Sequence, residues 1–404
     1  MTKYLLALIL FGCAFFTNAH EDHTKHQQST LAESFAFDAD GHLWRASVRD
    51  GFVEVNVSQD LGKTFSRAVK VNQQPQKISA DGEARPKIAI SAEGYIYVSW
   101  TEALQKPFSG YIWFSRSRDA GKTFDQPYVV HQDRSEITHR FDALNLSADG
   151  RITVAWVDKR DLLAAKAANK PYDGAAIYYA VSADKGASFV PEQKLADNSC
   201  ECCRIALANK PEGSVAALWR HVFAGSERDH MLAEIPIADE APQPKRATYG
   251  RWKIDGCPHH GAALASGGDG AHWWGYHMAW FDGGNDDAGK DATLFYARMD
   301  GEAWVSSPAK KFGNMKKQAG HPALAAMGEN VWLAWREKDA GKSQIWLMHS
   351  SDQGKNWMVP QKVVDTAGGA DYPALLQNRE QVFLVWNTEN EGLKLIPLSS
   401  LKAN

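Results

Sequence analysis

One short motif recurs along this chain and restricts the folds that are open to it. It reads Ser-x-Asp-x-Gly-x-Thr, Ser or Asn, followed by an aromatic residue, and its four copies are centred on Asp60, Asp119, Asp184 and Asp352. In a tight hairpin turn, Asp accepts backbone N–H bonds and Gly supplies a positive φ, while the aromatic residue packs against the sheet. Asp300-Gly301 with Trp304 is a degraded fifth copy. The motif predicts repeated hairpins in which the aspartates are structural, not catalytic.

Each motif belongs to a longer repeated unit. Seven short apolar segments begin about 50 to 63 residues apart, near Ser34, Arg85, Arg140, Cys203, His260, His321 and Tyr372. In six units the following strand ends on a tryptophan: Trp100, Trp156, Trp219, Trp280, Trp335 and Trp386. Repeats of this length are typical of propeller blades, between which large aromatic side chains pack. The sequence predicts an all-β propeller over residues 34–400, with seven blades favoured and six as the alternative.

The last unit has only three apparent strands. We expect residues 27–33 to supply its outer strand, because a propeller closed by both ends of the chain leaves no open sheet edge.

The repeated motifs resemble the Asp boxes of the sialidase-like, or BNR-repeat, superfamily, and the resemblance covers residues 34 to about 398. It implies a propeller, usually of six blades. In active sialidases it also implies three arginines that hold a carboxylate, a Tyr–Glu pair and an acid/base Asp. Arg85 is similar to the early arginine of that pattern, and Tyr372 lies late in the chain where the nucleophile is expected, with Glu389 as its candidate partner.

The remaining arginine positions depart from the sialidase pattern. Arg140 opens the third inner strand, but Cys203, His260 and His321 stand where further arginines are expected. A carboxylate clamp positions an anionic sugar for attack, so its loss predicts weak or absent sialidase turnover.

Thiols and imidazoles instead collect at the openings of neighbouring inner strands. The predicted metal donors are Cys200, Cys202, Cys203, Cys257, His259, His260 and His321. Thiolates combined with imidazoles suit copper or zinc. The alternative is a pair of disulfides, for example Cys202 with Cys203 and Cys200 with Cys257. The Cys-rich segments also resemble those of an uncharacterised CxCC- and CP-containing group of sialidase-like proteins, which implies no activity.

The N-terminus predicts export. Residues 1–19 have the charge, apolar core and small final residue of a signal peptide, so the mature chain would begin at His20 and reach the periplasm or the exterior. A lipid anchor at Cys13 is the alternative. Residues 20–33 form a polar tail in which His20, His23 and His26 favour capture of a transition metal. No later apolar run has the length of a membrane helix.

Charge narrows the range of partners. The 45 basic and 48 acidic residues are interspersed, which does not favour nucleic acid as a partner. Our first functional expectation is a propeller that binds a transition metal, copper above all, through its Cys/His cluster. The alternatives are a sialidase-type glycosidase that acts on an anionic sugar through Arg85, Arg140, Tyr372 and Glu389, and a non-catalytic propeller that binds glycans or proteins.

Overall fold

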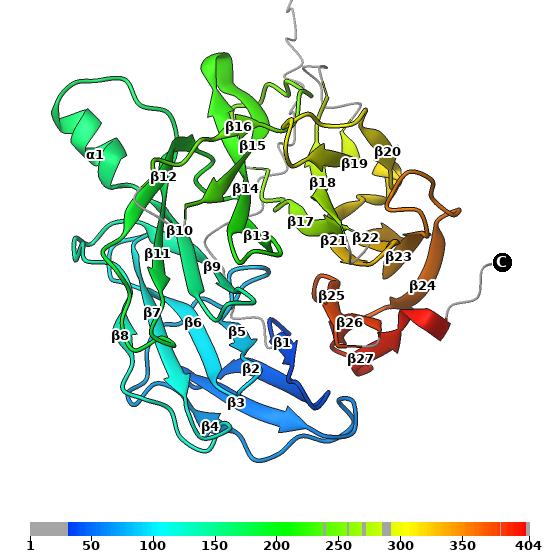
Figure 1. The fold of residues 1–404 in the computed structure, drawn as a ribbon, viewed down its shortest axis with the longest axis horizontal. Coiled ribbons are helices and arrows are strands. Elements are labelled where there is room, and N and C mark those ends of the chain that lie inside the picture. Colours follow the sequence, from blue (N-terminus) through cyan, green and yellow to red (C-terminus); the bar gives the residue numbers. More distant parts are fainter. Residues whose placement is uncertain are drawn as a thin grey trace, which may run out of the picture.

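The structure is a computed structural model that describes residues 31–236, 240–256, 258–268, 272–284, 292–379 and 381–400. Antiparallel strands dominate, and they are arranged around a common centre (Figure 1). The first sheet contains β1 (Ser34–Phe37), β2 (Leu43–Arg49), β3 (Phe52–Ser58) and β4 (Val69–Lys70). The second contains β5 (Lys87–Ile90), β6 (Ile96–Ala103), β7 (Gly110–Ser117) and β8 (Tyr128–Val129).

The third sheet is larger, because two successive groups of strands are joined in it. The first group is β9 (His139–Leu146), β10 (Ile152–Asp158), β11 (Ala175–Ser182) and β12 (Gln193–Ser199). The second is β13 (Ala206–Asn209), β14 (Val215–Phe223), β15 (Glu227–Ile235) and β16 (Lys245–Arg246). The bridge between the groups pairs Ser199 of β12 with His221 of β14.

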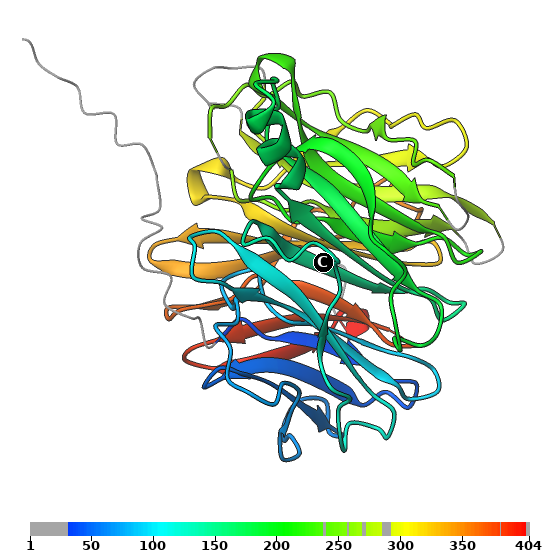
Figure 2. The ribbon, with the colours of Figure 1, turned by 90° about the vertical axis from the view of Figure 1, so that its left-hand side faces the viewer.

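Three further sheets complete the described part of the chain. They are β17 (Ala263–Gly268), β18 (Trp273–Asp282), β19 (Thr293–Asp300) and β20 (Lys310–Phe312); β21 (Gly320–Met327), β22 (Asn330–Asp339), β23 (Lys342–Ser350) and β24 (Gln361–Thr366); and β25 (Ala374–Gln377), β26 (Val382–Thr388) and β27 (Gly392–Pro397). Helix α1 (Arg160–Ala167) lies at the rim (Figure 2). Short 3-10 turns are η1 (Ala224–Ser226), η2 (Met315–Lys317) and η3 (Leu398–Ser400). None of the helices in the described residues is long and apolar enough to cross a membrane.

The first strands of the groups form the innermost layer. Each of β1, β5, β9, β13, β17 and β21 contacts the next in that order, and β25 contacts both β21 and β1. Figure 1 shows these strands around the centre, with the later strands of each group further out. The sheets themselves stay separate, so the ring is held by packing between sheets.

The core lies between neighbouring groups of strands. The second strands are buried on both faces, as in β10, where every residue is buried, and such strands are expected to read as continuous apolar runs. The prediction for the tryptophans is confirmed, because each repeated Trp packs in a cluster shared with the preceding group. Trp156, for example, packs with Tyr97 and Phe114 of the second sheet.

The repeated turns satisfy their own polar groups. In the second sheet the turn follows β7, where Ser117 Oγ donates to Asp119 Oδ1 over 2.8 Å. The Gly121 amide donates to Ser117 Oγ and the Thr123 amide to Asp119 Oδ1, both over 2.9 Å. Hydrogen bonds from Thr123 hold the pKa of Asp119 at about 2. Asp60, Asp184 and Asp352 accept the equivalent bonds after β3, β11 and β23.

Polar contacts tie the two ends of the described chain together. Asn387 in β26 donates to the Leu31 carbonyl and to Glu33 Oε2, over 3.2 Å and 3.1 Å. Phe37 packs on Phe383 with ring centroids 5.2 Å apart. Residues 31–33 form no strand, so they do not supply the outer strand that the sequence predicted for the last unit. Residues 27–30 lie outside the described part.

Candidate functional site

The segments that open the inner strands bring several predicted site residues together. The His321 imidazole stacks on the Tyr372 ring, with centroids 3.4 Å apart and planes at 11°. The ring centroids of His260 and His321 lie 4.7 Å apart, and the central carbon of the Arg336 guanidinium lies 4.6 Å from the centroid of the Tyr372 ring. We call these four residues, together with Glu83 and Arg204, the axial cluster. Its rings come from the segment before β17, the start of β21 and the segment before β25, far apart in sequence.

Glu83 is the carboxylate of this cluster, and the sequence analysis missed it. Its two oxygens lie 3.6 Å from His321 Nδ1 and 3.6 Å from Arg204 Nε. Burial alone would raise the pKa of Glu83, but His321 and Arg204 hold it at about 2. Burial lowers the pKa of His321, which favours a neutral ring at neutral pH. A carboxylate facing one imidazole nitrogen fixes the tautomer and leaves a lone pair on the other.

The axial cluster contains polar atoms that have no hydrogen-bond partner in the described part of the chain. They are Glu83 Oε2, Arg204 Nε, His260 Nδ1, His321 Nδ1 and Arg336 Nε, all buried. Buried polar groups are nearly always hydrogen-bonded, so a concentration of orphaned atoms is typical of a site that binds a ligand or an ion.

Arg85, predicted to hold a substrate carboxylate, is instead neutralised within the protein. Its guanidinium forms two hydrogen bonds to the Asp371 carboxylate, the second over 2.6 Å, and a third to the Glu33 carbonyl over 2.9 Å. This buried pair joins the segment before β5 to the segment before β25. Glu389 is exposed and accepts a bond from the Gly369 amide over 3.0 Å. The carboxylates recorded beside the His321–Tyr372 pair and Arg85 are therefore Glu83 and Asp371.

Arg140 and the axial cluster's Arg204 both lie over the ring of Phe141. The two guanidiniums are 4.8 Å and 4.7 Å from the Phe141 ring centroid. Phe141 has a φ of 59° and His321 a φ of 54°, in the left-handed region that non-glycine residues rarely adopt. Such backbone strain is found mainly at functional sites.

Three predicted metal donors meet in one buried group. Cys200 Sγ lies 3.2 Å from Cys203 Sγ and 3.7 Å from Cys202 Sγ, and all three sulfurs lie within 4.8 Å of one another. These cysteines form no disulfide within the described residues. We call them the thiol cluster. It occupies the loop between β12 and β13, where the bridge to β14 fixes the chain, and it packs against Phe141.

The predicted histidine donors do not join the thiol cluster. The group of sulfurs that could hold a metal contains no imidazole among the described residues, and His260 and His321 belong to the axial cluster instead. Cys257, His20, His23 and His26 lie outside the described part of the chain. His259 lies inside it, with a φ of 54°.

A second group of side chains that could face an ion belongs to a structural turn. Asp38, Asp40 and His42 could together face an ion, but Asp38 already accepts bonds from the Asp40 and His42 amides and from Trp44 Nε1. These bonds are those of a turn between β1 and β2.

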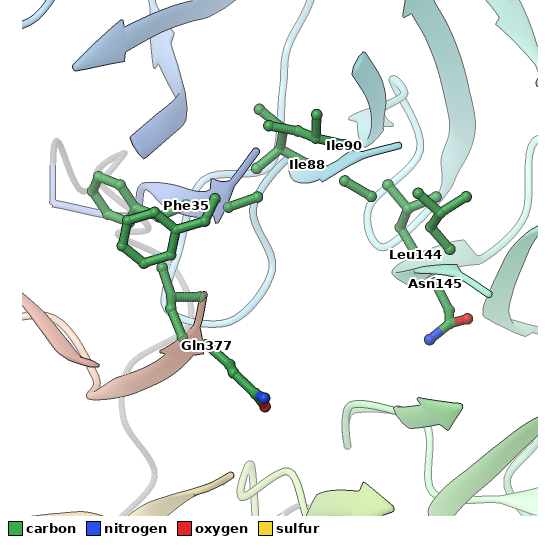
Figure 3. A pocket seen from close by; sticks show the side chains of 11 residues that line it. Phe35, Ile88, Ile90, Leu144, Asn145 and Gln377 are labelled. Atoms are coloured by element: carbon green, nitrogen blue, oxygen red, sulfur yellow. The ribbon is translucent and has the colours of Figure 1, made fainter. Parts of the chain in front are cut away.

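A cavity lies among the inner strands. A cavity of about 300 Å³ is lined by the inner strands β1, β5, β9 and β25. Figure 3 shows Phe35, Ile88, Ile90 and Leu144 around it, with Asn145 and Gln377 as the labelled polar side chains. The rings of the axial cluster therefore lie at or before the starts of the inner strands, and the strands line this cavity mainly with apolar side chains.

Comparison with known proteins supports this fold. No protein-family model matches the chain, and no curated protein matches it. An ulvan lyase of a polysaccharide lyase family, bound to -[GlcA(1-4)Rha3S]-, is similar with a TM-score of 0.53 at 13% identity, over 89% of this chain and 90% of that one. The Hadza microbial sialidase Hz136 is similar with a TM-score of 0.51 at 12% identity, over 88% and 75%. At these identities the likeness establishes the fold, which this chain shares with sialidase-like and other glycan-active propeller enzymes.

Proposed function

We propose that this protein binds a soft transition metal, copper or zinc, through Cys200, Cys202 and Cys203. The observation that carries the proposal is the convergence of three buried sulfurs within 4.8 Å. Metal–sulfur bonds of roughly 2.3 Å in a tetrahedral site place two sulfurs about 3.8 Å apart. The 3.7 Å between Cys200 and Cys202 fits that spacing, and the 3.2 Å to Cys203 requires only a small movement.

Further donors belong to the proposal but rest on the sequence. We propose Cys257 as a fourth ligand and the tail of His20, His23 and His26 as a separate capture site. Soft thiolates select Cu(I) and Zn(II) over harder ions. Of the two we propose copper first, with zinc as the alternative.

The test is metal analysis of protein prepared from the exported fraction without chelator. We expect about one equivalent of copper or zinc, with the thiols protected from alkylation until the metal is removed. Cys202→Ser with Cys203→Ser should abolish binding, whereas deletion of residues 20–26 should leave most of it. Protein that carries no metal and two disulfides would contradict the proposal.

A second candidate function is supported by the axial cluster. Glycan-active enzymes share the fold, and Glu83, His321, Tyr372, Arg204 and Arg336 combine an acid–base set with cationic side chains. This set could hold a carboxylated sugar. It differs from the sialidase pattern, because Arg85 is neutralised by Asp371 and Glu389 is bonded elsewhere. We therefore propose that any glycan activity uses the axial cluster and not a three-arginine clamp.

Parallel assays separate these glycan activities. The protein should be tested with a fluorogenic sialoside and with polysaccharides that contain glucuronate, together with Tyr372→Phe and His321→Gln. We expect little sialoside hydrolysis. Sialoside hydrolysis that Tyr372→Phe abolishes would restore the sialidase interpretation. If the protein binds glucuronate but shows no detectable activity on any of the substrates, the result would favour a non-catalytic binder.

The blade count and the location of the protein complete the proposal. We propose seven blades, because seven inner strands contact one another in a ring. We propose export to the periplasm or the exterior by a signal peptide at residues 1–19, with lipidation of Cys13 as the alternative. Mass analysis of the mature N-terminus distinguishes the two modes of export.

A further inference from the structure

A buried arginine lies beside the thiol cluster. Arg220 in β14 is 1% exposed and is among the largest fully buried side chains. Its Nη2 donates to the Phe281 carbonyl over 2.6 Å and its Nη1 to the Arg228 carbonyl over 3.4 Å, while its Nε has no partner. No carboxylate of the described residues lies within 4.0 Å of it. An isolated buried charge is strongly unfavourable unless another charge balances it.

The backbone ties Arg220 to the thiol cluster. The Cys200 amide donates to the Arg220 carbonyl over 2.9 Å, next to the bridge between Ser199 and His221. The hydrogen bond to Cys200 raises the pKa of Cys203 most, and the charge of Arg220 acts in the opposite direction by favouring the thiolate. The backbone therefore holds Arg220 next to Cys200, and the charge of its side chain acts on Cys203, a group that becomes anionic when it binds a metal.

One carboxylate is the rival counter-charge. Asp282 in β18 is 1% exposed, and within the described residues its Oδ2 accepts no hydrogen bond, although Trp280 bonds to the carboxylate. Burial raises the pKa of Asp282 to about 6, while Arg220 acts to lower it. It lies beyond ion-pair distance of Arg220, and it accepts the Gly284 amide over 2.7 Å. The charge of Arg220 thus lowers the pKa of Asp282, although the two side chains do not form an ion pair.

We infer that Arg220 is the counter-charge of an anionic metal–thiolate complex at Cys200, Cys202 and Cys203. This inference rests on the proposed metal-binding function and says which state of the cluster the fold supports. Three thiolates give a net charge of minus one with Zn(II) and minus two with Cu(I). Disulfides and thiols are neutral, so an oxidised cluster would leave the charge of Arg220 balanced by Asp282 alone.

Metal titrations on a set of variants test the inference. Cu(I), held by a competing chelator without oxygen, and Zn(II) are titrated into wild type, Arg220→Gln and Arg220→Lys. Groups that surround metal ligands typically change affinity by roughly 10- to 100-fold when they are lost. We expect Arg220→Gln to weaken both metals by that range, Cu(I) more than Zn(II) because its complex is more anionic. Arg220→Lys should restore part of the affinity.

Arg228 offers a matched control. It lies on the adjacent strand β15, opposite Val222, and its side chain donates to the Ile254 carbonyl. Arg228→Gln should leave both affinities unchanged. Equal metal affinity in folded Arg220→Gln and wild type would overturn the inference, as would an equal loss in Arg228→Gln. If wild type binds neither metal, the proposed function fails with it, which is a separate and visible outcome.

A second variant keeps the inference testable if Arg220→Gln does not fold. Asp282→Asn removes the rival negative charge and leaves Arg220 in place. If Arg220 serves the thiol cluster, this change should leave metal affinity unchanged or increase it, because an anionic neighbour repels thiolates. A tenfold or greater loss of affinity in folded Asp282→Asn would show that Asp282 supports the site, and would overturn the inference.

Discussion

The turns between the third and fourth strands and the segments before the first strands are opposites within the same repeat. The turns at Asp60, Asp119, Asp184 and Asp352 repeat the same residues, and their polar atoms bond within the turn. The inner-strand segments differ from one group to the next, and buried atoms of Glu83, Arg204 and His321 form no hydrogen bond with the described residues. The positions that repeat from group to group thus form structural turns, and the positions that differ between groups carry the candidate site.

The largest expected contrast concerns two ion pairs. Arg85 and Asp371 form a buried pair before the inner strands, whereas Arg118 and Asp125 form a 3.1 Å pair at an outer turn, where Arg118 is 60% exposed. Removing one partner of a buried pair costs about 3–5 kcal/mol, and exposed pairs contribute about 0–1 kcal/mol. Urea denaturation should show this difference between Arg85→Met and Arg118→Met.

A double variant sharpens the first prediction. Arg85→Met combined with Asp371→Leu replaces both charges, so it should recover much of the stability lost in Arg85→Met alone. Similar losses at Arg85 and Arg118 would contradict the distinction between the two regions.

A second contrast concerns aspartates and pH. The pKa of Asp282 is about 6 in the folded protein and 3.8 in the reference state, so folding loses stability as pH rises from about 4 to about 6. Asp282→Asn should remove a penalty of about 3 kcal/mol at pH 8 and almost none at pH 4. The pKa of Asp119 is lowered to about 2, so the charged form of Asp119 stabilises the folded protein, and this stabilisation is lost as pH falls from about 4 to about 2.

Melting temperatures across this pH range check both signs. Asp119→Asn should destabilise the protein at pH 8, with a smaller effect as pH falls toward 2. A stabilising effect of Asp282→Asn that stays constant between pH 4 and pH 8 would rule out the titration as its cause.

The smallest contrast lies between two turn glycines, one in a repeated turn after a third strand and one between β9 and β10. Gly186 has a φ of 75°, and an added Cβ would lie 2.8 Å from the Phe114 ring. Gly150 has a φ of 84° with nothing within 4 Å. Ala at either position pays about 1 kcal/mol of backbone strain, and Gly186→Ala adds about 1–3 kcal/mol of overpacking. Equal losses in thermal unfolding would show that the repeated turns are not packed on their neighbours.

The repeated parts of the fold were predictable because each carries a local signal. Asp119 with Gly121 specifies a turn by its own hydrogen bonds, and Trp156 marks a buried strand by its place in an apolar run. The pairing of Ser199 with His221, which fuses two groups of strands, has no comparable local signal. Helix α1 was not predicted, and it lies in an insertion between β10 and β11 that the repeat does not contain.

The candidate site was only partly predictable. Alignment of the repeats identified His260, His321 and Tyr372 before the inner strands, and the spacing of Cys200, Cys202 and Cys203 indicated their cluster. Glu83 and Arg204 were missed because each stands beside a residue that the alignment selected. Arg220 was not among the predicted site residues, since its buried position depends on the packing of β14 against β18. The partner of Arg85 also depends on contacts 286 residues away.

The pairing of Arg85 with Asp371, and of Leu31 with Asn387 across 356 positions, has a kinetic consequence. The segment made first by the ribosome cannot find these partners until nearly the whole chain exists. Loop closure over such separations is slow, and the first and last sheets keep apolar surface uncovered in the meantime. A chain shortened before Asp371 should therefore accumulate as an aggregation-prone intermediate even though most of its sheets are intact.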